Sequence, residues 1–203
     1  AARAAAGGAI AGLTAAPTDT AWGVKWVKAQ RVWIELGYTG AGVVVGHFDT
    51  GIWLTHPDIA NRLWTNPGET PGNAVDDDGN GYVDDVHGWD FGDQDNDPND
   101  DVVGTGANHG THTAGTVAGD GTNGTITGVA PGAQVMACKV ALSDGSGGPF
   151  SAIYEAQQYA MAMGARVFTM SMGVAGSLPG SLRQAERYNG DAIRVAGVAF
   201  FNS

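Results

Sequence analysis

Four short apolar runs recur along the chain, and helical patterns occupy two of the intervals between them. The runs are apolar at successive rather than alternate positions, which is typical of strands buried on both faces. They comprise Gly42 to Asp49, Gln134 to Leu142, Arg166 to Ser171 and Val198 to Phe201. Helices are predicted from Phe150 to Met163, ended by Gly164, and from Ser181 to Val195. Strands that alternate with helices predict a parallel sheet covered on both faces.

The start of the chain has a different character. Ala and Gly dominate Ala1 to Ala16 without the apolar core of a signal peptide, so residues 1–20 are expected to be a linker or a processed segment. From Trp22 the pattern becomes helical, and Gly37 is a natural end. This helix is predicted to pack inward through Val27, Val32, Trp33 and Leu36. Residues 21–203 are long enough for one domain with a sizeable core.

Composition narrows the class of protein. Hydrophobic residues make up 43% of the chain and charged residues 15%, which indicates a globular protein, and no apolar run is long enough to span a membrane. The net charge is −11, and twelve of the 21 acidic residues are Glu69 and the Asp residues from Asp76 to Asp101. This acidic insertion, residues 66–101, argues against nucleic-acid binding and favours a hard cation held by oxygen ligands. Cys138 is the only cysteine and is predicted to be a small buried residue.

Two polar residues occupy positions where an open parallel sheet places its ligand site. Asp49 ends an apolar strand, and Gly51 allows a sharp turn after it. His109 precedes a run of small residues ending at Gly119, which would let a helix pack closely on the sheet. A carboxylate and an imidazole so placed are two of the three groups of a serine protease triad. The alternatives are that Asp49 caps a loop and that His109 merely packs.

Together these segments resemble the subtilisin-like serine proteases. Asp49-Thr50-Gly51 is similar to the Asp-Thr/Ser-Gly segment of that family, and His109 to Gly115 is similar to its His-Gly-Thr-His-x-Ala-Gly segment. Three further segments follow in the family's order, namely Gly128 to Pro131, Lys139-Val140 and Met170 to Gly173. The resemblance implies an α/β fold of three layers, a doubly wound and mostly parallel sheet with helices on both faces, incomplete at its C-terminal end.

The same resemblance implies roles for individual residues. Asp49 would orient His109, His109 would be the general base, and His112 would be a buried structural histidine. An edge strand and the strand Ser171 to Gly173 would bind an extended peptide between them by β-augmentation. The substrate-binding residues expected from these two strands are Gly145, Ser146, Gly147, Ser171 and Gly173. Secretion and an inhibitory propeptide as partner are further expectations from the family.

The nucleophile is not evident in the sequence. No Gly-Thr-Ser-Met-type segment occurs before Ser203, so the serine is expected further downstream, and the 203 residues alone are predicted to be inactive. An alternative alignment makes Asn202 the oxyanion donor, and it ranks second because Phe201 would then replace a glycine.

His47 lies two residues before Asp49 on the same face of the strand. It would either tune that carboxylate or pack, and packing is favoured.

Structural calcium is the cofactor that the sequence predicts. The segment Asp76 to Asp85 contains the spacing of the first nine positions of an EF-hand loop. The ligands expected from this spacing are the side chains of Asp76, Asp78, Asn80 and Asp84 and the carbonyl of Tyr82. Because His87 stands at position 12, a further ligand is expected from Asp85 or from Asp90 to Asp97. By resemblance to family calcium loops, Asp58, Asp120 and Thr122 are also candidate ligands. The alternative is a solvated acidic loop.

Two other functions compete with the protease. In the first, His109 and His112 bind a metal ion at helical spacing, with Asp49 or an acidic residue of the insertion, and the protein is a metal-dependent hydrolase. In the second, the protein is a catalytically inactive, calcium-binding relative of the subtilases, which the absence of a serine segment favours directly. Zinc dependence would distinguish the first of these, and an intact gene without the serine segment would distinguish the second.

Overall fold

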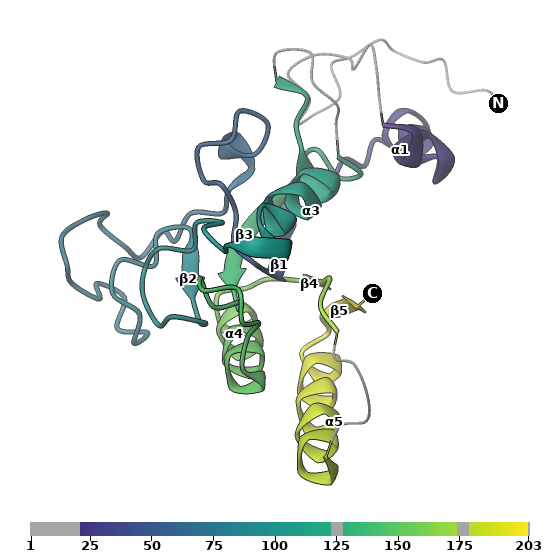
Figure 1. Cartoon of the computed structure of the whole chain (residues 1–203). Coiled ribbons are helices and arrows are strands. Elements are labelled where there is room, and N and C mark those ends of the chain that lie inside the picture. Colours follow the sequence, from purple (N-terminus) through teal and green to yellow (C-terminus); the bar gives the residue numbers. More distant parts are fainter. Residues whose placement is uncertain (1–20, 123–127, 174–178, 203) are drawn as a thin grey trace.

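A parallel sheet of five strands, in the order β2-β3-β1-β4-β5, lies at the centre of the computed structural model (Figure 1). The structure describes residues 21–122, 128–173 and 179–202. The strands are β1 (Val44–Asp49), β2 (Gly88–Asp90), β3 (Gln134–Lys139), β4 (Val167–Met170) and β5 (Ala199–Asn202). The order reverses beside β1, which pairs with β3 on one side and with β4 on the other. The predicted doubly wound parallel sheet is therefore confirmed.

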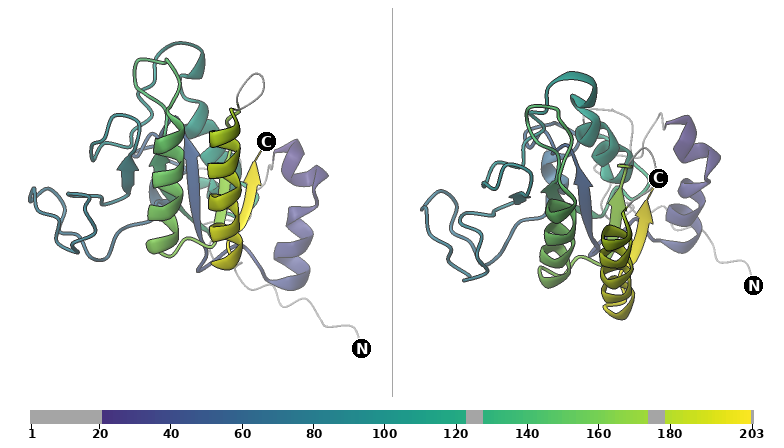
Figure 2. Two further views of the ribbon diagram at one scale, coloured as in Figure 1. Left: turned by 90° about the horizontal axis from the view of Figure 1, so that it is seen from below. Right: turned by 60° about the horizontal axis from the view of Figure 1, so that its bottom comes forward.

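Helices cover both faces of this sheet. Helix α3 (His109–Ala118) packs on one face, where Ala114 and Ala118 join the buried cluster around Val45 and Val135. Helices α4 (Phe150–Ala162) and α5 (Gly180–Val195) lie side by side on the opposite face (Figures 1 and 2). The three layers agree with the expected fold. The ends of α4 also match the prediction, since the chain turns at Gly164 with a positive φ.

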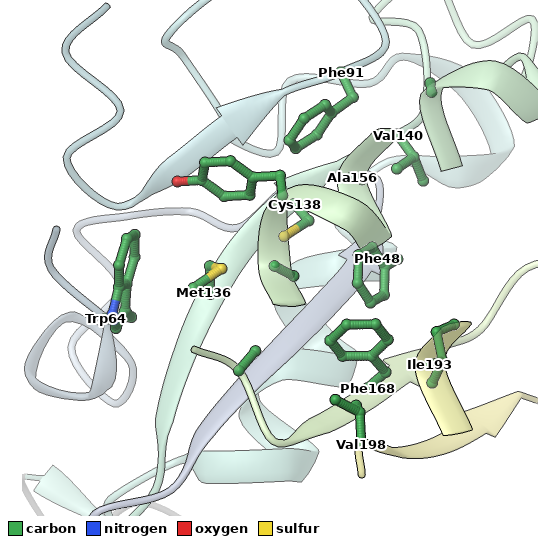
Figure 3. Close-up of a cluster of buried hydrophobic side chains, with 14 residues drawn as sticks. Phe48, Trp64, Phe91, Met136, Cys138, Val140, Ala156, Phe168, Ile193 and Val198 are labelled. Carbon is green, nitrogen blue, oxygen red and sulfur yellow. The ribbon is translucent and has the colours of Figure 1, made fainter. Parts of the chain in front are cut away.

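The larger core lies between the sheet and α4 (Figure 3). Its centre is an edge-to-face pair of Phe48 and Phe168, whose ring centroids are 4.9 Å apart. Cys138 is buried in the same cluster, as predicted, and burial raises the pKa of its thiol. Because side chains alternate along a strand, Phe48 anchors β1 to this core while Asp49 faces the α3 side.

The N-terminal helix differs from its prediction. It consists of three short pieces, α1 (Trp22–Trp26), α2 (Ala29–Arg31) and the π-helical η1 (Val32–Leu36), and Lys28 adopts a left-handed conformation between the first two. This break rotates the second part, so Val24, Ala29 and Trp33 are buried. Trp33 was predicted correctly, but Val27, Val32 and Leu36 are exposed. The chain turns at Gly37, as expected. The linker predicted over residues 1–20 lies outside the described residues.

The acidic insertion forms turns around the edge strand β2. Short 3-10 helices lie before and after it, η2 (Ala60–Arg62) and η3 (Gly104–Gly106). Strand β2 approaches β3 so closely that a Cβ at Gly88 would lie 1.9 Å from the carbonyl oxygen of Ala137. Only glycine fits there, and it also has a positive φ. This contact makes part of the acidic insertion an integral strand of the sheet.

A buried ammonium joins the acidic insertion to β3. Lys139 Nζ is fully buried and lies 2.5 Å from Asp90 Oδ2, 2.8 Å from Asp101 Oδ1 and 3.4 Å from Asp93 Oδ2. Burial opposes the charge of Lys139, but hydrogen bonds and attraction from Asp101 and Asp90 outweigh it and raise its pKa. Lys139 therefore supplies a buried positive charge to three Asp residues of the acidic insertion.

Candidate active site

Asp49 and His109 meet at the carboxyl end of the sheet. Strand β1 ends at Asp49 and helix α3 begins at His109, and the His109 Nδ1 atom lies 2.7 Å from Asp49 Oδ1. The Asp49 side chain is 1% exposed, whereas the His109 side chain is 43% exposed. The ring thus links a buried carboxylate to the surface, which is the arrangement that a general base oriented by an acid requires.

Two more donors hold the Asp49 carboxylate. The backbone N–H of Thr50 donates to Oδ1 over 2.8 Å, and the hydroxyl of Thr113 donates to Oδ2 over 3.1 Å. Thr113 lies one turn after His109 on α3, so the same helix supplies both the imidazole and this hydroxyl. These two hydrogen bonds fix the orientation of the carboxylate.

Glycines let α3 approach the turn that follows β1. A Cβ at Gly110 would lie 2.1 Å from the carbonyl oxygen of Gly51, so a side chain at this position would push the helix away. Gly51 itself has a φ of 110° and lies against the backbone of Asn99. The two glycines next to Asp49 and His109 therefore set the distance between these residues.

Asp100 joins the turn after β1 to the start of α3. This residue was not identified from the sequence. Its Oδ1 accepts from the Thr50 hydroxyl over 2.8 Å, and its Oδ2 accepts from the N–H and hydroxyl of Thr111 over 2.9 and 2.6 Å. Thr50 in turn accepts from the N–H of Gly110 over 2.8 Å. The end of the acidic insertion thus tethers α3 to the turn after β1. Its position in a run of Asp residues gave no signal of this role.

His47 lies beneath the pair on the α3 side of the sheet. It is 2% exposed, and its Nε2 atom lies 2.9 Å from Thr113 Oγ1. Among the described residues its Nδ1 atom has no hydrogen-bond partner. Burial lowers the pKa of His47, although the negative charges of Asp49 and Asp100 oppose this shift. His47 is therefore neutral near pH 7.

The prediction that His112 is buried is wrong. His112 is exposed, because it lies on a side of α3 that faces a groove rather than the sheet. The groove has a volume of about 390 Å³ and lies between α3 and the ends of β4 and β5. Within the described chain, no metal-binding group includes His109 or His112. The metal-dependent hydrolase thus gains no support.

The expected substrate-binding residues lie on both sides of β1. Ser171 and Gly173 follow directly after β4, and Ser171 borders the groove together with Asn202. Gly145, Ser146 and Gly147 are exposed, but they form a turn rather than the predicted edge strand. The N–H of Leu142 donates to the Gly147 carbonyl over 2.7 Å, and both glycines have a positive φ, so the backbone curls back on itself here.

The acidic insertion brings one group of carboxylates together. Oxygen atoms of Glu69, Asp78 and Asp85 lie within 4.8 Å of one another, the only such group among the described residues. Asp78 was a predicted ligand and Asp85 a predicted substitute for position 12, whereas Glu69 was missed because it precedes the loop pattern. Burial raises the pKa of Asp85, and hydrogen bonds from Tyr159, Asn66 and Asn80 oppose the shift.

The other predicted loop ligands have partners within the chain. Asp76 accepts from the N–H groups of Asn80 and Gly81, and the Asn80 side-chain oxygen accepts from the N–H of Tyr82. Asp84 accepts from three backbone N–H groups, those of Gly72, Asn73 and Ala74. These contacts stabilise the turns of the loop.

The second predicted calcium site is only partly within the described residues. Asp120 is buried, and its Oδ1 accepts from the N–H and hydroxyl of Thr122, while Arg62 Nε lies 3.5 Å from its Oδ2. The carbonyl of Asp58 accepts from the N–H of Asp120. The remainder of this loop, residues 123–127, lies outside the described residues. Arg62 thus supplies a counter-charge at a carboxylate that the sequence assigned to calcium.

Comparison with known proteins places the chain in a family. The subtilase family (peptidase S8) matches residues 40–200. The chain is 36% identical to the minor extracellular protease Vpr of Bacillus subtilis (strain 168) over 73% of its length and 16% of that protein. It is 30% identical to the major intracellular serine protease of the same organism over 77% of its length and 42% of that protein. Identity to thermitase of Thermoactinomyces vulgaris is 32%, over 82% of the chain and 49% of that protein.

The chain thus spans less than half the length of each of these relatives. These relatives include both an extracellular and an intracellular protease. Within the described residues, no helix is both long and apolar enough to cross a bilayer. The matched region contains both β1 with Asp49 and α3 with His109. From the extent of this match, the chain belongs to the subtilase family.

Proposed function

We propose that this chain is the front part of a serine endopeptidase that hydrolyses peptide bonds by an Asp-His-Ser triad. The observation that carries the proposal is the 2.7 Å contact of His109 Nδ1 with the buried Asp49, in a chain that belongs to the subtilase family. The nucleophilic serine is supplied by a segment outside residues 1–203. The 203 residues alone are then inactive, since loss of a triad member lowers turnover by several orders of magnitude.

In this mechanism His109 takes the proton from the serine hydroxyl as that oxygen attacks the peptide carbonyl. Asp49 holds the Nδ1–H tautomer, so Nε2 is free to act as the base, and it stabilises the imidazolium that forms. His109 then gives the proton to the leaving amine, and water hydrolyses the acyl-enzyme by the reverse steps. The serines of α4 and α5, Ser151 and Ser181, belong to helices on the opposite face of the sheet. They are therefore poor candidates for the nucleophile.

The groove beside α3 supports the proposal that another segment supplies the serine. His112, Thr113 and Thr116 form its α3 wall, and Thr169, Ser171 and Phe201 contribute to the opposite wall. A segment that carries a serine into this groove would lie along the same helix as His109. We assign the extended substrate to the surfaces at Gly145 to Gly147, which are exposed, and at Ser171 to Gly173, which are partly or fully exposed. An inhibitory propeptide would occupy the same surfaces.

Fluorophosphonate labelling tests the proposal, because the reagent reacts only with an activated serine. The sample is the purified gene product that contains residues 1–203, measured as intact mass before and after labelling. We expect one label on a serine outside these residues, and we expect His109→Ala to abolish it. Arg187→Ala, at an exposed residue of α5 on the opposite face of the sheet, is the control and should label normally. A gene product without any labelled serine would instead establish an inactive relative of the subtilases.

Calcium is the cofactor that we propose for the acidic insertion. Glu69, Asp78 and Asp85 converge there, and carboxylate oxygens are the ligands that Ca²⁺ prefers. Clustered carboxylates repel one another without a cation, so the bound ion would stabilise the turns around β2. We also infer that the protein is secreted, since calcium sites of modest affinity are filled at extracellular concentrations. Detection of the protein in the culture medium of its source would test that inference.

A further inference from the structure

We propose that His47 is a positioning residue of the active site, which acts through the Thr113 hydroxyl to hold the Asp49 carboxylate. The inference rests on the proposed function, because it concerns the same pair of Asp49 and His109. Its basis is a continuous polar path beneath that pair. His47 Nε2 lies 2.9 Å from Thr113 Oγ1, and Thr113 Oγ1 lies 3.1 Å from Asp49 Oδ2.

The direction of these hydrogen bonds follows from the charges. Thr113 has a single hydroxyl proton, and three oxygens are within its reach, Asp49 Oδ2, the His109 carbonyl at 3.2 Å and the Gly110 carbonyl at 3.1 Å. The carboxylate is the only charged acceptor of the three, and charge-assisted hydrogen bonds are the stronger ones. Thr113 therefore donates to Asp49, and its oxygen is left to accept from His47 Nε2–H.

This assignment fixes the tautomer of His47. A proton on Nε2 leaves Nδ1 as a bare nitrogen, and Nδ1 is the buried atom without a partner among the described residues. The opposite tautomer would bury an unpaired N–H and would set two lone pairs against each other at Thr113, which is the less favourable arrangement. His47 is thus a neutral donor in the Nε2–H form.

Because His47 is uncharged, it does not alter the charge interaction between Asp49 and His109. The charged or titratable groups that act on His47 are Asp49 on its own strand, Asp100 of the acidic insertion and His109 at the start of α3. A charged His47 would share the negative charge of Asp49 with His109 and would disfavour a second imidazolium there. Burial keeps His47 uncharged, so it contributes a hydrogen bond without competing for the carboxylate.

Loss of the His47 donor frees the Thr113 hydroxyl. The proton of Thr113 can then turn to the carbonyls of His109 or Gly110, as hydroxyls in helices commonly do. Asp49 Oδ2 would lose its donor, and only the Thr50 N–H and His109 would still restrain the carboxylate. The expected result is a looser Asp49 and a less well-oriented His109.

NMR of the chain with ¹⁵N-labelled histidine tests this without any catalytic activity. In the unmodified chain, we expect His47 to show the pattern of a neutral Nε2–H ring at pH 7 to 8. We expect the His109 Nδ1–H proton to exchange with water about three- to tenfold faster in H47L, the loss that one ordinary hydrogen bond gives. T113V should show the same increase, and the double variant should be no faster than either single variant.

H47Q is the rescue variant, because its amide keeps a donor near the position of the ring Nε2–H. It should exchange His109 Nδ1–H at the original rate, and the control H112Q should do the same. In a gene product that labels with fluorophosphonate, H47L and T113V should lower kcat by the same factor and leave KM unchanged. A failed serine label would overturn the proposed function while leaving these NMR results intact.

Three results would overturn the inference itself. They are an Nδ1–H pattern for His47, additive effects of H47L and T113V, and an H47Q variant that behaves like H47L. Any of them would mean that His47 only fills space. If H47L fails to fold, T113V and the tautomer pattern of the unmodified chain still decide the question.

Discussion

The Tyr159 hydroxyl donates to Asp85 Oδ2 over 2.6 Å, and both residues are buried. The contact ties α4, which covers one face of the sheet, to the acidic insertion at the edge of the sheet. It also supports Asp85, whose carboxylate belongs to the group that we propose to bind calcium. One buried hydrogen bond thus joins a core helix to a surface loop.

Tyr159→Phe should lower the free energy of unfolding by about 1 to 3 kcal/mol, because a buried carboxylate loses a donor while the ring still packs. Urea unfolding followed by tryptophan fluorescence measures the change. Tyr154→Phe is the matched control, since the Tyr154 hydroxyl makes only a 3.5 Å contact with the Leu182 carbonyl. Equal midpoints for Tyr159→Phe and the unmodified chain would show that Asp85 is held by its other donors.

Calcium should stabilise the chain. With free calcium at about 100 times its dissociation constant, the free energy of unfolding should rise by about 2.7 kcal/mol relative to chelator. Thermal unfolding with excess calcium and with EGTA measures this difference. Asp78→Asn should reduce the response, whereas Asp144→Asn, at an exposed acid outside the group, should not. Equal thermal midpoints in calcium and in chelator would contradict the proposed site.

Acid should destabilise the fold through His47. Burial lowers its pKa in the folded chain, whereas in the unfolded chain the ring has an ordinary pKa of about 6.5. Between these values the unfolded chain binds a proton that the folded chain does not. The contribution is therefore complete above about pH 6.5 and is lost as the pH falls below it, by at most about 1.4 kcal/mol per pH unit. Denaturant unfolding at several pH values should show a shallower dependence for His47→Gln.

Lys139→Met should lower the free energy of unfolding by about 3 to 5 kcal/mol, because it leaves Asp90 buried without its counter-charge. Guanidinium unfolding measures the loss. Combining it with Asp90→Leu should restore part of the stability, since the unpaired carboxylate is then removed. Lys25→Met, at an exposed lysine, is the control. A double variant as unstable as the sum of the single ones would indicate that Lys139 and Asp90 act independently.

Much of the fold and the centre of the site could be predicted from local patterns. The apolar run before Asp49 marked a buried strand, and the small residues after His109 marked a closely packed helix. Both signals lie within a few residues in sequence. The contact of Asp49 with His109 could then be inferred, because the carboxyl end of a central strand is where such a sheet binds ligands.

The remaining features depend on contacts between distant segments. Nothing in the residues around Asp100 indicates that it tethers Thr50 to Thr111, and nothing around Lys139 indicates three Asp partners. The exposure of His112 likewise depends on what faces α3 across a groove. The prediction of which residues after Trp22 are buried was wrong for a local reason. Lys28 adopts a left-handed conformation, so a different set of side chains in the helical segment faces the core.

The strand order has a consequence for how the chain acquires its structure. Strand β1 is made early, but its partners β3 and β4 come much later, so Val44 pairs with Gln134 and Val45 with Val167. Such long sequence separations slow folding, because a large loop must close before any pairing stabilises it. A chain interrupted during synthesis before residue 134 leaves β1 open at both edges, as an unpaired apolar strand available to other chains.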